Sequence, residues 1–387
     1  AGLGWNIHNE SFVTSSKIDI LKIRGSLGYT GKVNFSPFQA MTMYQFSGDL
    51  EYLNGIGAVP QGIGNEDLGW ERELSYNLGT DISLFDRRLN FTFDIYLKKT
   101  TDLVLDASRA PSTGTTSAKE NIGEMENKGL EFQVDGMLVQ RNDFYWQVAA
   151  TGSMNRNRIL KINSALKKAN EDANKVDSKT PLAQYEEGES TTALKVVKSA
   201  GIDPATGQEV FIKLNGERTF EYSADDKFVI GDTEPRFRGT VSTNLFYKGF
   251  SLYLLGRYEC GAYLYNETRA TKVEGANPKK NADKRVFDSR WKSPGDIAFY
   301  KDIADSDGWG TNPKHSDRFV EKENVFTLGT VNFGYEFGQN ICSKIGVRNL
   351  RVGVNLTDIV RWSNVKIERG TTYLYSNGFE FTLSTTF

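Results

Sequence analysis

Apolar and polar residues alternate one by one along many stretches of this chain. Every second residue from Leu89 to Leu97 is apolar, and the stretches 348–357 and 379–387 follow the same pattern. Successive side chains of a β-strand leave opposite faces, so each stretch predicts a strand with one apolar and one polar face. Eleven strands are expected, the first being the weakest, at approximately 4–12, 20–30, 70–84, 89–103, 121–138, 144–158, 236–247, 250–265, 323–337, 348–361 and 377–387.

The expected strands and their connections together indicate a membrane barrel. Many strands reach ten or more residues, whereas a globular strand has about five or six and a tilted membrane-crossing strand about 9–11. Short turns at 85–88, 140–143 and 248–249 alternate with much longer connections. In an antiparallel meander this alternation puts every long connection at one end, as in outer-membrane barrels. The long connections are 31–69, 104–120, 159–235, 266–322 and 362–376.

Aromatic residues gather at both ends of the expected strands. The row beside the short turns comprises Phe85, Phe144, Trp146, Tyr247, Phe250, Tyr335, Phe337 and Phe387. The row at the opposite ends comprises Trp70, Tyr263, Tyr265 and Trp362. Two such rows are typical of membrane interfaces. Alternating strands alone are commoner in soluble sheets, but strand length, loop segregation and the paired rows together favour an all-β fold, an antiparallel transmembrane β-barrel.

Composition excludes several other classes of protein. The 387 residues are 39% hydrophobic, the mean hydropathy is −0.47, and no stretch approaches the roughly 18 apolar residues of a membrane helix. The net charge is −2, from 47 basic and 49 acidic residues, so nucleic acid is not an expected partner. Cys260 and Cys342 make no disulfide framework. They are expected at opposite ends of the barrel wall and therefore unpaired.

No motif predicts enzyme chemistry. The stretch 315–317 contains His, Ser and Asp, but neighbours in sequence cannot converge on one reacting atom, so a solvated loop is expected. Asp302, Asp305 and Asp307 form a weak candidate calcium site, because Ser316 occupies the position where a calcium loop counted from Asp305 needs an acidic residue. No other metal and no cofactor is expected.

The polar face of the strands carries charges of both signs, which predicts a wet or plugged lumen. A barrel filled by its own side chains has about eight strands, and bacterial single-chain barrels have even numbers. Eleven strands therefore predict that further strands complete the barrel. Lumen-facing residues include Asn90, Asp94, Arg257, Arg351 and Asn355. Lipid-facing residues include Phe91, Phe93, Ile95, Leu252, Leu254, Val352 and Val354.

Nine stretches carry a family resemblance. They are 21–28 (LKIRGSLG), 65–72 (NEDLGWER), 77–81 (NLGTD), 96–100 (YLKKT), 121–131 (NIGEMENKGLE), 201–207 (GIDPATG), 231–236 (GDTEPR), 247–250 (YKGF) and 290–296 (RWKSPGD). In this order they resemble the C-terminal half of the SusC/RagA family of TonB-dependent outer-membrane transporters. The last residues, 368–387, are similar to the final hairpin of a family member.

The resemblance implies a plugged barrel of about 22 strands, of which residues 1–387 form the C-terminal part. The plug, the TonB-contacting segment and the N-terminal strands are expected outside this chain. In lipid the strands 4–12 and 377–387 need partners for their free edges, and the N-terminal half of the same barrel is expected to provide them.

The resemblance also implies a function, which is active nutrient import without enzyme activity. The expected location is the outer membrane of a Gram-negative, Bacteroidetes-type bacterium, where the barrel crosses the lipid many times. Oligosaccharide is the first candidate substrate and peptide the second. The expected partners are a SusD-like surface lipoprotein that acts as a lid and the TonB–ExbB–ExbD complex. A passive porin and a structural or adhesive surface barrel remain as alternatives.

Aromatic residues of the long loops are the candidate substrate contacts. Aromatic faces can lie against the C–H surfaces of sugars. The candidates are Tyr185, Tyr222, Tyr300 and Trp309, with packing inside the loops as the alternative role.

Overall fold

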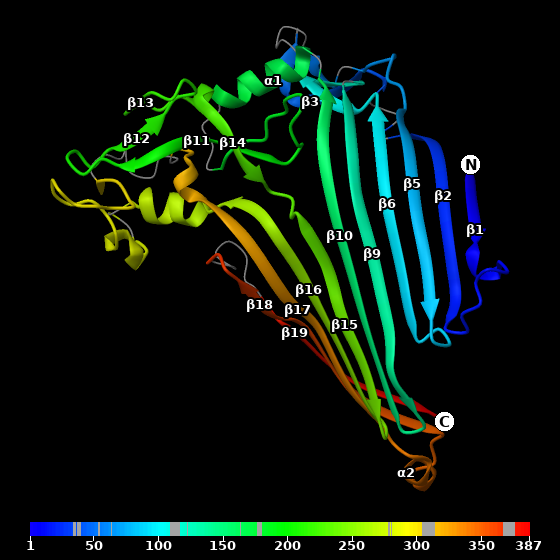
Figure 1. Cartoon of the computed structure of the whole chain (residues 1–387). Helices are drawn as coiled ribbons and strands as arrows, with labels where there is room; N and C mark the ends of the chain where they lie inside the picture. Colours follow the sequence, from blue (N-terminus) through cyan, green and yellow to red (C-terminus); the bar gives the residue numbers. More distant parts are fainter. Residues whose placement is uncertain are drawn as a thin grey trace.

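Long antiparallel strands form one curved wall, which Figure 1 shows from the side. The computed structural model describes residues 1–33, 36, 40–52, 55–62, 64–108, 117–121, 123–162, 164–175, 180–277, 279, 281–303, 314–366 and 376–387. Eleven strands form the wall, each hydrogen-bonded to the next in chain order. They are β1 (Gly2–Asn6), β2 (Ile18–Lys32), β5 (Glu71–Leu84), β6 (Leu89–Thr101), β9 (Glu124–Arg141), β10 (Phe144–Lys161), β15 (Phe237–Tyr247), β16 (Phe250–Tyr265), β17 (Val320–Glu336), β18 (Asn349–Ser363) and β19 (Gly378–Thr386). The predicted all-β, antiparallel fold is confirmed.

The eleven wall strands correspond one to one to the strands predicted from the alternation. The main difference is at the N-terminal end, where β1 ends at Asn6 and a 3-10 turn follows at Ile7–Asn9. The indole Nε1 of Trp5 donates a hydrogen bond to Glu10 (2.9 Å). The chain folds back at this point, so the predicted strand 4–12 is too long at its C-terminal end.

All the short connections of the wall lie at one end and all the long ones at the other, as Figure 1 shows. The turn between β15 and β16 contains only Lys248 and Gly249, both with positive φ (47° and 91°). This conformation gives the backbone twist that two antiparallel strands need in a tight hairpin. The short helix α2 (Gln339–Lys344) lies at the same end, between β17 and β18. The predicted segregation of loops is therefore present.

The strand registers collect the apolar side chains on one face of the wall. Ile95 on β6 lies opposite Leu78 on β5, and Val354 on β18 lies between Phe333 on β17 and Phe381 on β19. The protein covers these side chains only in part, since Leu78 is 56% exposed and Phe333 is 47% exposed. A continuous exposed apolar face is typical of a barrel wall against lipid.

The other face carries charged residues that pair across the strands. Arg24 on β2 reaches over β5 to Asp94 on β6, with 2.6 Å between Nη2 and Oδ2, and also contacts Asp81 (3.2 Å). Gly79 on β5 lies beneath this ion pair, and a Cβ atom there would come within 2.6 Å of both side chains. The predicted lumen-facing residues Asn90, Asp94, Arg257, Arg351 and Asn355 all lie on this face. The predicted separation of faces is confirmed.

Ring contacts connect the aromatic row at the short-turn end of the wall. Phe250 packs against Tyr335 with ring centroids 4.5 Å apart, and Phe144 packs against Tyr247 at 6.0 Å. At the other end, the prediction for Tyr265 is wrong. Its ring packs against Phe319 and His315 of a loop and so belongs to a folded loop region instead of an exposed girdle.

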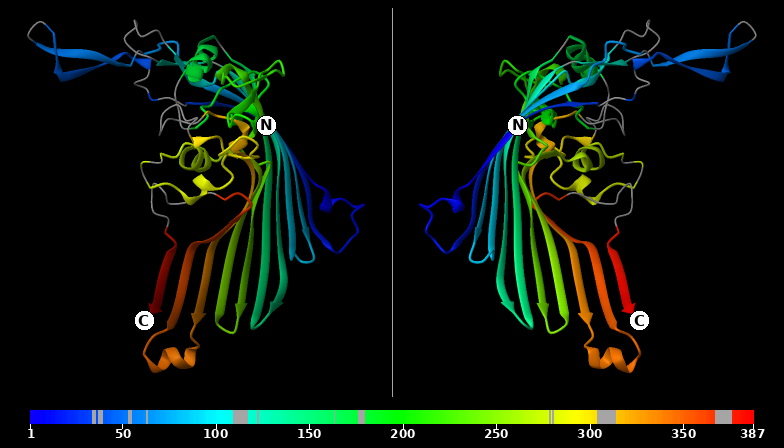
Figure 2. Two further views of the ribbon diagram at one scale, coloured as in Figure 1. Left: turned by 90° about the vertical axis from the view of Figure 1, so that its left-hand side faces the viewer. Right: turned by 90° about the vertical axis from the view of Figure 1, so that its right-hand side faces the viewer.

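The long connections contain secondary structure that the alternation did not reveal. A hairpin of β3 (Met43–Tyr52) and β4 (Gly55–Gly62) extends far from the wall, as Figure 2 shows. A second small hairpin pairs β7 (Val104–Ser108) with β8 (Ser117–Asn121). A four-stranded sheet lies above the wall, next to the helix α1 (Ser164–Lys175). Its strands are, in spatial order, β13 (Arg218–Thr219), β12 (Glu209–Ile212), β11 (Ala193–Ile202) and β14 (Lys227–Asp232).

Within the described part of the chain, neither α1 nor α2 nor any other helix has the length and hydrophobicity that a membrane span requires. Both cysteines are free thiols. Cys342 is buried in α2, and Cys260 lies in β16 toward the long-loop end.

The face assignment predicts how a charge on the apolar face changes the stability of the wall. Replacing Ile95 by Arg in the full-length protein should destabilise the folded barrel by about 2–4 kcal/mol, because the guanidinium would face hydrocarbon. Thr92→Arg is the matched control, since Thr92 lies between Asp81 and Gln133 on the polar face. Urea-induced unfolding in lipid vesicles measures both variants. Equal destabilisation by the two substitutions would contradict the assignment.

Candidate functional site: a loop assembly above the wall

The described residues of the two longest connections, 162–236 and 266–319, fold together into one unit, here called the loop assembly. The backbone N–H of Val197 on β11 donates to the carbonyl of His315 (3.1 Å). The next contact follows two residues on, where the N–H of Ser199 donates to Asp317 Oδ1 (2.9 Å). The indole of Trp291 donates to the carbonyl of Pro204 (2.8 Å). Segments about a hundred residues apart in sequence therefore share one hydrogen-bond network.

The loop assembly has its own apolar core. Val197 is fully buried in β11, while Ala270, Val273 and Phe319 pack with Tyr300 in a separate cluster. Ser316 is also fully buried, so the expectation of a solvated loop at 315–317 is wrong. The reason is that this segment runs beside β11 and forms a parallel bridge between Ser316 and Val197.

A buried ion triad joins the two connections. The guanidinium of Arg318 contacts Glu209 on β12 (2.6 Å) and Glu274 (2.8 Å), and all three side chains are at most 6% exposed. Arg318 also donates to the carbonyl of Phe299 (2.6 Å). Burial lowers the pKa of Arg318, but the carboxylates of Glu274 and Glu209 more than offset this effect and raise the pKa above its ordinary value. The triad stays charged and fixes β12 to the second connection.

A second buried arginine fixes the path of the second connection. Arg290 donates to the carbonyls of Val286 (2.7 Å), Val273 (2.6 Å) and Lys301 (3.0 Å). Burial lowers the pKa of Arg290, and Glu274 partly opposes this effect. Its planar guanidinium donates hydrogen bonds to carbonyl groups of three separate segments, and these carbonyl groups are not paired within a β-sheet.

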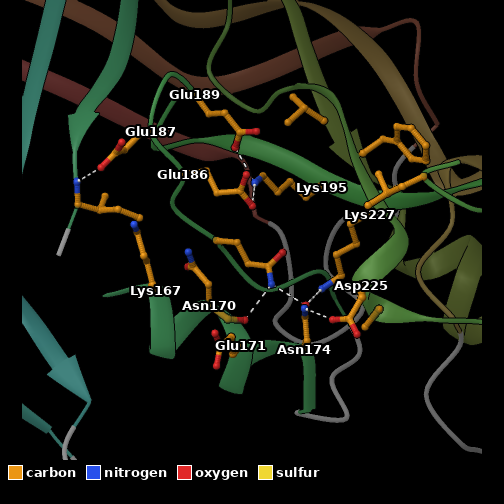
Figure 3. A pocket seen from close by; sticks show the side chains of 16 residues that line it. Lys167, Asn170, Glu171, Asn174, Glu186, Glu187, Glu189, Lys195, Asp225 and Lys227 are labelled. Atoms are coloured by element: carbon orange, nitrogen blue, oxygen red, sulfur yellow. Dashed lines mark hydrogen bonds and ion pairs between the residues drawn. The ribbon is translucent and has the colours of Figure 1, made fainter. Parts of the chain in front are cut away.

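One pocket of the loop assembly has a volume of about 740 Å³ and lies between α1, β11 and β14. Figure 3 shows it from close by, with α1 contributing Lys167, Asn170, Glu171 and Asn174. The remaining lining residues are Ile162, Gln184, Glu186, Glu187, Glu189, Lys195, Leu214, Ala224, Asp225, Lys227, Phe228 and Val229.

Amide side chains hold the walls of this pocket together. Asn170 of α1 bonds both backbone groups of Tyr185, donating to its carbonyl (2.6 Å) and accepting from its N–H (2.9 Å). Gln184 donates to Asn174 Oδ1 (2.6 Å), which also accepts from the Lys227 ammonium (2.8 Å). Asn174 in turn donates to Asp225 (2.9 Å). Figure 3 shows this chain of contacts along the bottom of the pocket.

The charged groups of the pocket are also largely paired. Lys195 is almost completely buried and contacts Glu186 (2.7 Å) and Glu189 (2.6 Å). Glu187 accepts from the N–H of Ile162 (3.1 Å). Burial lowers the pKa of the Lys227 ammonium, while Asp225 acts in the opposite direction.

A second, smaller pocket of about 150 Å³ lies beside the ion triad. Tyr222 forms part of its lining and packs edge-on against Phe211, with ring centroids 5.3 Å apart. The ammonium of Lys314 lies 5.6 Å from the centroid of the Tyr222 ring. Burial raises the pKa of Tyr222 to about 12. A hydrogen bond with the backbone of His315 lowers this pKa, but by less than burial raises it. The phenol is therefore neutral, so its hydroxyl can form hydrogen bonds and its ring offers a flat face for contact.

Comparison with known proteins agrees with this architecture. Residues 1–187 match the model of a family described as TonB dependent receptor-like, beta-barrel. The TonB-dependent receptor P39 of Formosa agariphila is 26% identical across 94% of this chain. The predicted resemblance to TonB-dependent receptors is confirmed. The SusC/RagA resemblance is also confirmed.

Two further proteins are similar to this chain. The TonB-dependent receptor SusC of Bacteroides thetaiotaomicron is 30% identical over 41% of this chain, which corresponds to 17% of SusC. A structure of the RagAB peptide transporter has a TM-score of 0.79 over 94% of this chain at 22% identity, and shows the shared fold. The chain spans only 38% of the P39 receptor and 40% of the RagAB chain.

The predicted aromatic contacts occupy different environments. Tyr222 lines the smaller pocket. Tyr185 is half-buried, and its backbone, not its ring, belongs to the network of the larger pocket. Tyr300 is 6% exposed and its hydroxyl accepts from Arg269 (3.2 Å), so a ligand reaches its ring only if the loops rearrange. Trp309 lies outside the described residues.

The candidate calcium site is only partly visible. Asp302 donates its backbone N–H to the carbonyl of Gly207 (3.0 Å), whereas Asp305 and Asp307 lie outside the described residues. The described part of the chain contains no group of three or more residues that could hold a metal ion.

Sequence reasoning missed the residues that build the two pockets and the triad. Asn170, Gln184 and Arg318 belong to no motif, and their roles depend on contacts between distant segments. One available signal was the composition of 164–175 (SALKKANEDANK), whose Ala, Leu, Lys and Glu residues favour a helix.

The ion triad predicts a specific weakness of the loop assembly. Arg318→Met should destabilise the assembly by about 3–5 kcal/mol, because Glu209 and Glu274 would remain buried without their cation. Lys213→Met is the control, since Lys213 forms an exposed ion pair with Glu217 and should cost less than about 1 kcal/mol. Hydrogen exchange of β11 and β12 in the full-length protein measures the difference. Unchanged protection in Arg318→Met would contradict the assigned role of the triad.

Proposed function

We propose that this chain forms the C-terminal part of a TonB-dependent importer in the outer membrane of a Gram-negative bacterium. The observation that carries the proposal is the two-faced wall, with an exposed apolar face, a charged opposite face and all long loops at one end. The match of residues 1–187 to the TonB-dependent receptor β-barrel family model supports the same role. The transported nutrient is an oligosaccharide as first candidate and a peptide as second, and the chain catalyses no covalent reaction.

The open edges of the wall support a further part of this proposal. β1 pairs with β2, and β19 pairs with β18, so these two strands form the edges of the described sheet. Unpaired backbone groups in lipid would each cost several kcal/mol. We therefore propose that an N-terminal half of the same barrel pairs with both edges and also provides the plug and the TonB-contacting segment.

Two partners follow from the proposed import. A SusD-like surface lipoprotein would close over the long-loop end, where the loop assembly lies (Figure 1). The TonB–ExbB–ExbD complex would supply energy from the inner membrane through the N-terminal part. Support for both comes from the family and from the resemblance to SusC.

Energy dependence distinguishes import from passive diffusion. In cells that depend on this transporter for a fluorescent oligosaccharide or peptide, deletion of TonB or collapse of the proton gradient should abolish uptake. A passive porin has no energy-coupled step, so it would continue to admit the probe under both conditions. An adhesive barrel would bind ligands at the cell surface and import none of them.

Tyr222 is the best placed of the aromatic candidates for contact with the substrate. Tyr222→Ala should weaken substrate binding by the full-length transporter about tenfold, since one aromatic contact contributes roughly 0.5–1.5 kcal/mol beyond its buried area. Tyr222→Phe keeps the ring and should retain most of the affinity. Phe287→Ala changes an exposed ring outside both pockets and should have no effect. Titration calorimetry measures all three, and equal affinities would exclude Tyr222.

A further inference from the structure

The larger pocket of the loop assembly combines polar and apolar surface. Its volume of about 740 Å³ lies within the range of small-molecule sites. Amides and carboxylates from α1 and the segment 184–189 contribute hydrogen-bonding groups. Apolar side chains complete the lining, namely Ile162, Leu214, Ala224, Phe228 and Val229. A pyranose ring has the same two-sided character, with C–H faces and hydroxyl edges.

The walls of this pocket are held in place before any ligand arrives. Asn170 uses both ends of its amide on the Tyr185 backbone, and Asn174 connects Gln184, Lys227 and Asp225. A pre-organised pocket avoids the cost of ordering side chains when a ligand binds. This network distinguishes the pocket from a gap between mobile surface side chains.

The charged residues of the lining disfavour both anionic and cationic ligands. Five carboxylates against three ammonium groups leave a formal charge of −2, which repels an anionic ligand. Yet Glu186 and Glu189 already pair with Lys195, and Glu187 and Asp225 accept protein hydrogen bonds. A desolvated cation needs a carboxylate partner of its own, and these four carboxylates already have protein partners. The fifth, Glu171, is exposed on α1, where an ion pair in water contributes little.

We propose that this pocket is a subsite for neutral sugar residues and discriminates against anionic glycans. The inference rests on the proposed import function and narrows its substrate class. Hydroxyl groups of the sugar would bond the amides and the remaining acceptor sites of the carboxylates, since each carboxylate can accept several hydrogen bonds. The apolar side chains would contact the C–H faces of the ring.

The direct test fills the pocket and leaves its polar network intact. Ala224→Trp places an indole at the pocket lining, and Ala205→Trp adds the same indole at an exposed turn of the loop assembly outside this lining. The purified full-length transporter is first screened on an array of neutral, uronate-containing and sulfated oligosaccharides, and the best neutral ligand is then titrated. Ala224→Trp should weaken its binding at least about tenfold, and Ala205→Trp should leave it unchanged.

A charge reversal tests the selectivity without blocking the pocket. Glu171 is an exposed lining residue of α1, and Glu171→Lys brings the formal charge of the lining to zero. This variant should raise the affinity for the matching uronate oligosaccharide, relative to the affinity for the neutral ligand, about tenfold over the wild-type ratio. Because the substitution is on the surface of a helix, it also provides a test if Ala224→Trp fails to fold.

Several outcomes would overturn the inference. They are preferential binding of anionic glycans by wild type, no binding of any neutral oligosaccharide on the array, and unchanged neutral-sugar affinity in Ala224→Trp. Binding of a tryptic peptide pool that Ala224→Trp abolishes would assign the pocket to peptides instead. TonB-dependent uptake is measured separately, so a failed subsite with intact energy-coupled uptake leaves the import proposal standing. Neutral-sugar binding together with TonB-independent uptake would leave the subsite standing and contradict the import proposal.

Discussion

A single constraint governs the wall, because a backbone N–H or C=O group without a partner in lipid costs several kcal/mol. Strands that cross lipid must therefore pair on both sides, and each then has one face toward hydrocarbon and one toward the interior. The ladder from β1 to β19 follows from the first requirement. The contrast between exposed Leu78 and the Arg24–Asp94 ion pair follows from the second. Both effects together force the alternation seen in the sequence.

The same constraint explains why the wall was predictable from the sequence. A shift of the strand register by one residue would turn Ile95 inward and Asp94 toward lipid. The alternation of apolar and polar residues therefore determines the register. The predicted strand end at residue 12 and the predicted exposure of Tyr265 were wrong, because protein contacts determine the structure at these two places. β1 ends at Asn6 because Trp5 bonds back to Glu10. Tyr265 lies beyond the Gly261 bulge and packs into a protein core.

The loop assembly was not predictable because its order comes from contacts between distant segments. Arg318 and Glu209 are 109 residues apart, and neither belongs to a periodic pattern. Loops in water carry no requirement for alternation, so α1 and the strands β11–β14 leave only weak propensity signals. Tyr222 lines a pocket, as a candidate ligand contact should, but its contact with a ligand stays a prediction. The amide network of Asn170 was not predictable, because it uses the backbone of Tyr185.

The wall and the loop assembly are one continuous hydrogen-bonded structure. β16 and β17 run directly into the assembly, where the N–H of Asn266 donates to the carbonyl of Phe319 (2.7 Å) and Arg269 pairs with Glu321. The first connection, 162–236, likewise continues from β10 and leads into β15, so four strands of the wall join the assembly. The ladder changes register at Gly261, which has a φ of +81°. The N–H of Gly261 donates instead to Asn324 Oδ1 (3.0 Å). The bulge therefore interrupts the regular ladder where the wall meets the assembly without leaving this backbone donor unpaired.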